Sequence, residues 1–345
     1  SIYSDMQNIW DEYKDKSKMN LVLSGSIYSL MKKIFEDKKE LLFGRANNKI
    51  YLKPFTVKTL KEILKENYPN YKNSNLLSFY IFTGGVAKYV EIFVEKKAFT
   101  FEKQLDLIFD DFSLFLEEGK NLLIEEFGKE YTTYFSILSL IASSKTSRIE
   151  IESVLGRNIG GYLEKLEKDY TLIKKIKPIF AKEGSRTVKY EIIDNYFNFW
   201  FRFIYKYKSA IEIENYEFVK EIVKRDFSVY SGKFLEKYFI EKLKFTNNYS
   251  NIGTYWEKAN QNEIDIVAIN NLEKKVLIGE VKINLKKIDL EILKQKAKKL
   301  EKELSGYEYE YLAFSLDDMW DCQNRFWVPT ESKLLFKDKL IFKNK

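Results

Sequence analysis

A short run of residues from Val276 to Ile283 places a carboxylate and an ammonium group in an otherwise apolar segment. Apolar runs of this length that are rich in β-branched residues are typical of strands buried in a sheet. Side chains alternate between the two faces of a strand, so Glu280 and Lys282 are expected on one face and Val281 on the other. Since a strand needs partners for its backbone hydrogen bonds, this run predicts a sheet with charged groups at its centre.

A second run, from Glu263 to Ile269, alternates in the same way and places Asp265 on a strand. The residues between Asp265 and Glu280 suffice for the end of this strand, a turn at Asn270-Asn271 and the start of the next strand. Asp265 and Glu280 are therefore predicted to lie side by side on neighbouring strands.

Helical patterns surround these predicted strands. Upstream, residues 232–240 have helical periodicity, and Glu236 lies on the flank of their apolar face. Downstream, residues 289–304 form a lysine-rich amphipathic pattern, and residues 309–314 are typical of a further strand. The predicted order is helix, three strands, helix, strand, with Glu236 as a third acid that can reach the site.

Two carboxylates and a lysine in the middle of a small sheet suit phosphodiester cleavage assisted by a hard cation. Mg²⁺ takes oxygen ligands and keeps several waters, so one or two acids and a substrate phosphate suffice to hold it. A nearby lysine can orient the attacking water or offset the charge that develops on the phosphate. The alternative is that Glu280 and Lys282 form a solvated ion pair on an edge strand, which contributes about 0 to 1 kcal/mol.

Asp265, the sequence Glu280-Val281-Lys282 and the upstream Glu236 together resemble the PD-(D/E)XK nuclease superfamily. The resemblance implies a nuclease-like α/β domain over residues 226–345, with a magnesium site at Asp265 and Glu280. It also implies that Lys282 is the catalytic lysine and that Glu236 is an accessory acid.

The overall composition narrows the possible functions. The 345 residues suffice for two or three domains, and a content of 45% hydrophobic and 16% aromatic residues is typical of packed globular structure. Lys and Arg exceed Asp and Glu by 58 to 51, a mild basic excess that permits nucleic-acid binding without requiring it. The chain has no histidine, which excludes Ser-His-Asp triads, histidine general bases and histidine-ligated zinc.

Cysteine usage and hydropathy indicate where such a chain works. The single cysteine, Cys322, excludes a disulfide within the chain, so we expect a reducing, cytoplasmic setting. The charged residues Asp5 and Asp11 near the first residue are unlike a signal peptide. No apolar run is long enough for a membrane span, so no membrane association is expected.

Residues 1–55 show half of an α/β pattern. A helix over residues 1–18 leads into a predicted buried strand at Leu21–Leu23, and a second helix over residues 28–36 precedes a strand at Lys49–Leu52. The chain contains no Gly-x-x-x-x-Gly-Lys-Ser/Thr sequence, so the loop that cradles phosphates in P-loop proteins is absent from it.

This first segment nonetheless resembles the sensor end of a P-loop ATPase. By resemblance, Ser24 and Ser26 stand where such enzymes sense the γ-phosphate, and Arg45 stands where they place a trans-acting arginine. In the alternative interpretation Ser26 caps a helix and Arg45 is a surface residue, which is favoured because the P-loop is missing. ATP contacts by these residues are therefore expected only in an intact protein that has the loop.

Residues 56–118 are predicted to form a compact helical lid. The sequence from Thr83 to Tyr89 contains two glycines between two helices, and Lys88 within it could face nucleotide in the intact protein. The alternative is that the paired glycines only end one helix and begin the next.

Residues 119–193 have the order and length of a winged helix, with helices at 130–143, 147–155 and 161–168 and strands at 172–176 and 187–192. A lysine-rich wing, opposed only by Glu183, suits DNA phosphates. The alternative is that this unit packs on neighbouring domains and contacts no nucleic acid. The candidate DNA-binding residues are Arg157, Asn158, Lys165, Lys174, Lys175, Arg186 and Lys189.

Residues 194–225 begin with a dense run of bulky rings, from Tyr196 to Tyr207. Exposed rings can stack on bases, but rings at consecutive positions more often fill an interface on several sides. We therefore predict linker helices that are buried between two domains.

Short motifs along the chain resemble the archaeal-type P-loop ATPases that carry a C-terminal domain of unknown function, itself similar to PD-(D/E)XK nucleases. The resemblance implies a multidomain α/β protein with a partial ATPase core, a helical lid, a winged helix and a nuclease-like domain. The motifs lie at residues 24–26, 43–46, 83–89, 159–163, 199–203 and 263–267.

This resemblance implies the C-terminal part of an ATP-binding and ATP-hydrolysing protein that associates with DNA and carries a Mg²⁺-dependent nuclease-type site. In the alternative, the intact protein is a signalling-type switch ATPase, and its winged helix and an inactive nuclease-like domain bind protein partners or a second copy of the chain. The feature that separates the two is whether the four charged residues Glu236, Asp265, Glu280 and Lys282 converge around a solvent-open gap for a cation. Direct bonds from Lys282 to Asp265 or Glu280, in a cleft filled by apolar side chains, would instead remove the basis for catalysis.

Overall fold

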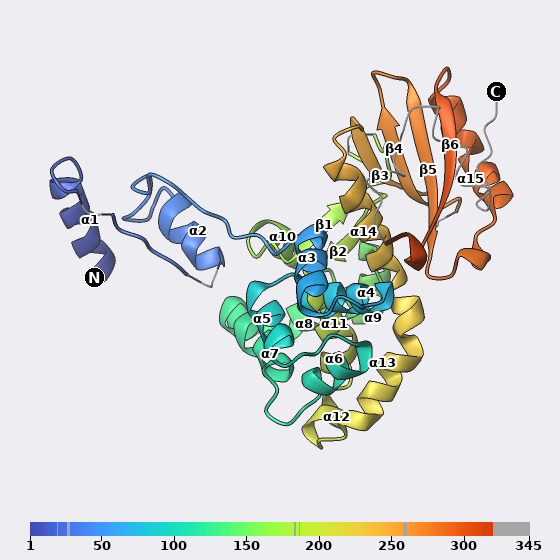
Figure 1. Cartoon of the computed structure of the whole chain (residues 1–345). Helices are drawn as coiled ribbons and strands as arrows, with labels where there is room; N and C mark the ends of the chain where they lie inside the picture. The colour runs from blue at the N-terminus through green and yellow to red at the C-terminus, as the bar shows by residue number, and fades with distance from the viewer. Residues whose placement is uncertain (19, 26–27, 183, 186, 258–260, 320–345) are drawn as a thin grey trace.

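A computed structural model describes residues 1–345 except 19, 26–27, 183, 186, 258–260 and 320–345. The described residues form a thin N-terminal arm, a central helical body and a small sheet that is covered by helices (Figure 1). The fold is mixed α/β, as the sequence predicts.

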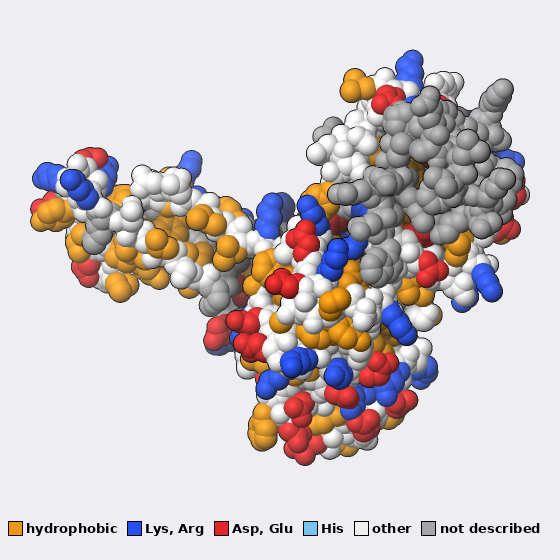
Figure 2. Space-filling view, in the orientation of Figure 1, with side chains coloured by type: hydrophobic (Ala, Val, Ile, Leu, Met, Phe, Trp, Pro, Cys, Tyr) orange, Lys and Arg blue, Asp and Glu red, His pale blue; other side chains and the backbone are white. Residues whose placement is uncertain are grey.

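The N-terminal arm consists of α1 (Ile2–Tyr13), α2 (Tyr28–Glu36) and extended segments. Both helices were expected, but the predictions of strands at Leu21–Leu23 and Lys49–Leu52 are wrong, because neither segment is paired in a sheet. Their side chains are largely exposed, with Val22 at 86% and Leu52 at 93%. A strand requires a neighbour for its hydrogen bonds, and the described residues of the arm offer none. Hydrophobic side chains consequently gather on the surface of the arm (Figure 2).

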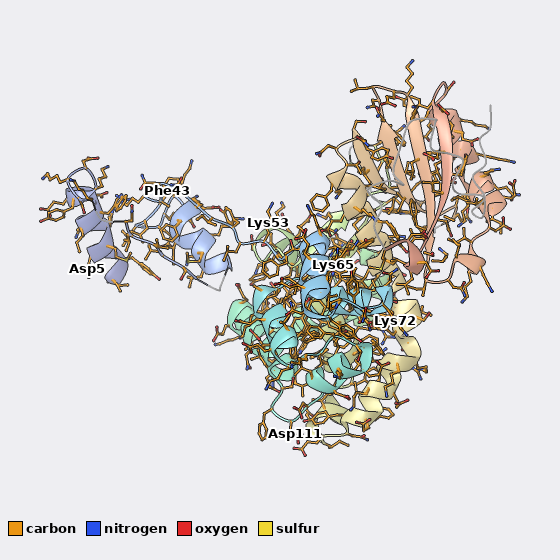
Figure 3. The ribbon with its side chains drawn as sticks, in the orientation of Figure 1. Asp5, Phe43, Lys53, Lys65, Lys72 and Asp111 are labelled. Atoms are coloured by element: carbon orange, nitrogen blue, oxygen red, sulfur yellow. The ribbon has the colours of Figure 1, made fainter. Side chains whose placement is uncertain are left out.

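The helical body begins at Val57, and its first helices pack around a buried hydrophobic helix, α4, most of whose residues are excluded from solvent. In Figure 3, Lys65 on α3 and Lys72 at the start of α4 lie in the part of the body toward the sheet, whereas Asp111 lies at its opposite end. The helical content predicted for residues 56–118 is observed. The helices are α3 (Val57–Asn67), α4 (Asn73–Thr83), α5 (Ala87–Glu95), α6 (Phe101–Ile108) and α7 (Leu114–Phe127).

Further helices and a hairpin follow, in the predicted order. Ser147 caps α9 together with Glu150 in a capping box, which explains where that helix begins. The two strands pair antiparallel, with Ile173 opposite Ile192. The interpretation of this unit as a winged helix stays a prediction. The elements are η1 (Gly128–Glu130), α8 (Tyr131–Ala142), α9 (Arg148–Leu155), α10 (Gly160–Lys168), β1 (Ile173–Ile176) and β2 (Lys189–Ile192).

The aromatic run forms α11 (Asn195–Phe199) and a π-helical segment, η2 (Trp200–Tyr205). Phe199, Phe201 and Phe203 are fully buried. These rings therefore fill the core, as the structural interpretation predicts, and cannot stack on bases. The chain continues through α12 (Lys208–Glu212) and α13 (Tyr216–Tyr230).

The last described region is a sheet in the order β3-β4-β5-β6, preceded by α14. β3, β4 and β5 are antiparallel, whereas β6 is parallel to β5, and α15 makes the crossover between them. The predicted order of helix, three strands, helix and strand is confirmed. The elements are α14 (Gly232–Phe245), β3 (Asn251–Tyr255), β4 (Ile264–Asn270), β5 (Lys275–Lys282), η4 (Leu285–Lys287), α15 (Leu290–Glu303), β6 (Glu308–Ser315) and η5 (Leu316–Met319).

The hairpin is docked on the sheet through the loop after β1. The Ile179 N–H donates to the Thr254 carbonyl at 2.8 Å, which gives a partner to the outer strand β3. The Ile179 side chain is buried among the apolar residues of the sheet. Contact of this kind protects an edge strand. Within the described ranges, no helix is long and apolar enough to cross a membrane.

Candidate functional site

The candidate site lies where β4 and β5 run side by side. Ile266 on β4 is paired with Gly279 on β5, so Asp265 and Glu280 follow as the next positions along the two strands. Each of these acids is only 8% exposed. The structure therefore brings together the two carboxylates that the alternation of residues predicts to be neighbours.

Lys282 bridges the two carboxylates. Its Nζ lies 3.1 Å from Oδ2 of Asp265 and 2.8 Å from Oε1 of Glu280. The Val281 N–H also donates to Oδ2 of Asp265, at 2.8 Å. From α15, Lys296 Nζ lies 3.3 Å from both carboxylate oxygens of Glu280. Two ammonium groups thus offset the negative charge of the buried acids.

The surroundings of Asp265 perturb its ionisation. Burial raises the pKa of Asp265, and the negative charge of Glu280 raises it further, while Lys282 and the Val281 N–H act in the opposite direction. Lys282 already relieves the repulsion between the carboxylates, so a metal ion that binds between them has to displace its ammonium group.

Glu236 reaches the same site from α14. Burial, and then the charge of Asp265, raise its pKa well above the usual glutamate value, while Lys282 opposes the shift. The helical position of Glu236, which sequence periodicity predicts, thus brings a third acid within electrostatic range of the two strand carboxylates.

The donor set fits a hard divalent cation only in part. In the part of the chain that the structure describes, no three acidic or cysteine side chains are arranged to hold a metal ion. Asp265 and Glu280 nevertheless offer the oxygen ligands that Mg²⁺ prefers, and Mg²⁺ is commonly held by one or two carboxylates, waters and a substrate phosphate. The chemistry of these two donors suits Mg²⁺, whereas Lys282 occupies the position between them.

The residues predicted to sense nucleotide do not converge. Arg45 pairs with Asp11 inside the arm, at 2.7 Å, and Lys88 pairs with Glu118 inside the helical body, at 3.2 Å. Ser24 is exposed, and Ser26 lies outside the described residues. Gly84 ends α4 in a left-handed conformation, as the helix-capping alternative for the paired glycines predicts.

The lysines of the hairpin are paired with carboxylates. The prediction that only Glu183 opposes them is wrong, because acids outside the loop serve as their partners. Glu183 and Arg186 lie outside the described residues. The ion pairs are Lys174 with Glu191 at 3.3 Å, Lys175 with Glu167 at 2.6 Å and Lys189 with Glu263 at 2.7 Å. Lysines held in this way must leave their partners before they can bind a phosphate.

The remaining candidate DNA-binding residues lie near the start of α10. Arg157 donates to the hydroxyl of Thr133 and lies over the ring of Tyr162. Asn158 accepts a hydrogen bond from the Gly160 N–H at 3.0 Å, so its side chain supports the turn before the helix. Lys165 is exposed.

A group of polar residues between α11 and α14 was not predicted from the sequence. Lys233 and Lys237 donate to the side-chain oxygens of Asn198 and Asn195, at 2.8 and 2.6 Å. Both asparagines are 3% exposed. The spacing of Lys233, Glu236 and Lys237 on one helical face was available as a signal, since residues three and four apart are neighbours on a helix.

Comparison with known proteins gives a family match for part of the chain. Residues 200–300 match the DUF234 family, described as "Archaea bacterial proteins of unknown function". The matched region runs from η2 into α15 and includes the candidate residues Glu236, Asp265, Glu280 and Lys282.

Individual relatives extend beyond this region. An uncharacterized protein of Methanocaldococcus jannaschii is 30% identical over 292 residues, which cover 82% of this chain and 64% of that protein. This chain therefore spans less than two thirds of the length of that relative. Sulfotransferase 1E1 of the mouse is 22% identical over 205 residues, or 57% of this chain and 68% of that protein. No solved structure matches the chain significantly.

Proposed function

We propose that this chain carries a Mg²⁺-dependent, nuclease-type site that cleaves phosphodiester bonds in DNA. The observation that carries the proposal is the pair of buried carboxylates, Asp265 and Glu280, which share one ammonium group on neighbouring strands. The order of the helices and strands around the pair is the one expected for a PD-(D/E)XK nuclease-like domain. Buried acids are expensive to maintain unless they are compensated, so their juxtaposition favours a functional role.

Each residue has a role that its position supports. Asp265 and Glu280 would hold the magnesium ion, which when bound supplies Lewis acidity toward the phosphate and a water of lowered pKa. Lys282 would leave at least one of the carboxylates and orient the attacking water or contact the phosphate. Glu236, with its raised pKa, would accept or hold a proton close to the same water.

The experiment is calorimetric titration of Mg²⁺ or Mn²⁺ into the protein and into Asp265→Asn, with a supercoiled-plasmid nicking assay on the same samples. We expect metal binding and nicking in the wild type and the loss of both in the variant. Glu291→Gln is a matched control, since it also turns a carboxylate into an amide, on the exposed face of α15. An Asp265→Asn variant that nicks DNA as fast as the wild type would contradict the proposal.

A second candidate is a protein-interaction role in a signalling-type switch ATPase. Two observations favour it: Lys282 already compensates both acids, and the hairpin lysines are engaged with acids of the same chain. An internal cation of this kind can replace a metal ion in a domain that has lost catalysis. Failure of the wild type to bind either metal would favour this candidate.

ATP binding is proposed only for an intact protein that includes a P-loop. Ser24, Ser26, Arg45 and Lys88 would then need to be brought toward the nucleotide by that additional part. In this chain Arg45 and Lys88 are paired with local acids. Titration of ATP into this chain is therefore expected to show no specific binding.

A further inference from the structure

The most unusual charged groups outside the strand acids are two lysines on α14. Lys233 and Lys237 are one helical turn apart, and both side chains are partly buried at the junction of α14 with α11. Burial lowers the pKa of Lys233 to about 8, and it lowers the pKa of Lys237 as well. In both cases burial is the largest cause, and the charge of Glu191 opposes it.

The acceptors of the two ammonium groups are neutral. Lys233 donates to the amide oxygen of Asn198 at 2.8 Å. Lys237 donates to the amide oxygen of Asn195 at 2.6 Å and to the carbonyl of Ile193 at 2.8 Å. Over the described ranges, neither lysine has a carboxylate oxygen within ion-pair distance. The hairpin lysines Lys174, Lys175 and Lys189, by contrast, all have one.

The acid whose charge acts most strongly on the two lysines is already engaged. Glu191 acts on both lysines through its charge, but its carboxylate forms an ion pair with Lys174 at 3.3 Å. Arg202 lies near Lys233 and adds further positive charge, and Nη1 of Arg202 is buried without a hydrogen-bond partner in the described part of the chain. Asp194 and Glu241 also act on Lys237 through their charges, as Glu236 does on Lys233, and Arg202 is paired with Asp226 at 3.0 Å. Carboxylates thus lie within electrostatic range of the two ammonium groups, but among the described residues none lies at ion-pair distance from them.

This region, the junction of α14 with α11, adjoins the candidate site. Glu236 lies on the same face of α14 as the two lysines, and the charge of Asp265 contributes, after burial, to its raised pKa. A polyanion held at the lysines would extend toward the strand carboxylates. Ile193, whose carbonyl accepts a hydrogen bond from Lys237, is 40% exposed, so this end of the region is open to solvent.

We propose that Lys233 and Lys237 form a phosphate-binding subsite that holds a backbone phosphate of a nucleic-acid strand next to the strand carboxylates. The subsite rests on the proposed function for its substrate class, but it requires no metal. Asn195 and Asn198 position the ammonium groups in the absence of ligand, and the phosphate replaces these neutral acceptors with a charged one.

The test is the binding of a fluorescein-labelled single-stranded DNA oligonucleotide, followed by anisotropy in EDTA over a range of salt concentrations. Each phosphate contact made by a lysine contributes about 0.7 to the slope of log K against log salt for single strands. We expect Lys233→Gln and Lys237→Gln each to weaken binding several-fold and to lower the slope by about that amount. Lys298→Gln, at an exposed lysine of α15, is the control and is expected to bind like the wild type.

A second pair of variants keeps both lysines. Asn195→Asp and Asn198→Asp place a carboxylate within hydrogen-bond distance of each ammonium group, so an internal anion would compete with the phosphate. We expect these variants to bind the oligonucleotide several-fold more weakly while their melting temperature is not reduced. If the lysines only fastened α14 to α11, a carboxylate in place of each amide would leave oligonucleotide binding unchanged.

The outcomes separate the subsite from the catalytic proposal. Lysine-dependent binding in EDTA without any cleavage in Mg²⁺ would support the subsite and contradict the nuclease proposal. A wild type that does not bind the oligonucleotide, or lysine variants with an unchanged salt slope, would overturn the subsite. The same measurements with an RNA oligonucleotide of the same sequence show whether the subsite binds either backbone. If the lysine variants lose DNA binding and RNA binding to the same extent, this supports a contact to the phosphate alone.

Discussion

Lys189 Nζ lies 2.7 Å from Oε1 of Glu263, an ion pair that joins the β1–β2 hairpin to the sheet across 74 positions of the sequence. The same ammonium group lies 4.5 Å from the centre of the Trp256 ring. Together with the hydrogen bond from Ile179 to Thr254, these contacts dock the hairpin on β3 and on the segment that leads into β4, the strand that carries Asp265. A residue predicted to bind DNA is thus used to join two parts of the chain.

Replacing either partner of this ion pair is expected to reduce stability modestly, and the loss is expected to be larger for Lys189 than for Glu263. The Lys189 side chain is 20% exposed and that of Glu263 49%, so the ion pair itself contributes about 0 to 1 kcal/mol. Lys189→Met also loses the contact with Trp256, which contributes about 0.5 to 1 kcal/mol more. In urea unfolding, Lys189→Met should therefore lower the free energy of unfolding more than Glu263→Gln does.

The double variant of Lys189 and Glu263 completes a thermodynamic cycle that isolates the coupling between them. Lys168 and Glu164 form an exposed ion pair within α10 and provide a matched control pair, for which little coupling is expected. Equal losses for the two single variants at the hairpin would contradict a role for Trp256.

Gly279 is required by the packing under the candidate site. A Cβ at this position would lie 2.7 Å from the Phe314 ring and 3.3 Å from Ile266. Gly279→Ala should therefore cost roughly 1 to 3 kcal/mol of stability, since the neighbouring ring and strand must move. Gly232→Ala is the control, because a Cβ there meets nothing and alanine favours the helix. Urea unfolding that shows equal stability for both variants would contradict this account.

The positions of the candidate acids could be predicted because they follow from patterns of neighbouring residues in the sequence. Alternation of residues places Asp265 and Glu280 on strands, and the short connection between them allows those strands to be neighbours. Helical periodicity places Glu236 on the flank of the preceding helix. The structure agrees with all three placements.

What could not be predicted depends on partners that are remote in sequence. The apolar run at Leu21–Leu23 has the composition of a strand, but a strand exists only where another strand pairs with it. Lys189 was predicted to be free to bind DNA, because the acid that pairs with it lies far along the chain and could not be foreseen. The neutral partners of Lys233 and Lys237 are likewise 35 and 42 positions away.

Removal of residues 1–50 is expected to change the melting temperature of the remaining protein very little. α1 has no buried residue, and Ile50 is 85% exposed, so the arm contributes little apolar burial to the body. The cut leaves intact the hydrogen bond from the Phe55 N–H to the Gly85 carbonyl, at 2.7 Å. Thermal unfolding followed by circular dichroism tests this, and a large drop in melting temperature would show that the arm supports the core.

The stability of the protein should depend on pH through Glu236. Burial and the nearby charge of Asp265 raise the pKa of Glu236 well above its usual value, so the folded state keeps a proton that the unfolded state has already lost. At pH values above the usual glutamate pKa, the folded state therefore binds more protons than the unfolded state does. The free energy of unfolding then falls as pH rises, by at most about 1.4 kcal/mol per pH unit for one group, until Glu236 ionises in the folded protein.

Glu236→Gln tests this linkage, because glutamine resembles the protonated acid and cannot ionise. We expect urea unfolding over a pH series to show a flatter dependence for Glu236→Gln, and a stability gain over the wild type that grows as pH rises. Glu291→Gln, at an exposed acid of α15, should follow the wild type at every pH. If the curves for Glu236→Gln and the wild type run parallel, the carboxyl of Glu236 ionises normally in the folded protein. It could then not hold a proton beside the candidate site.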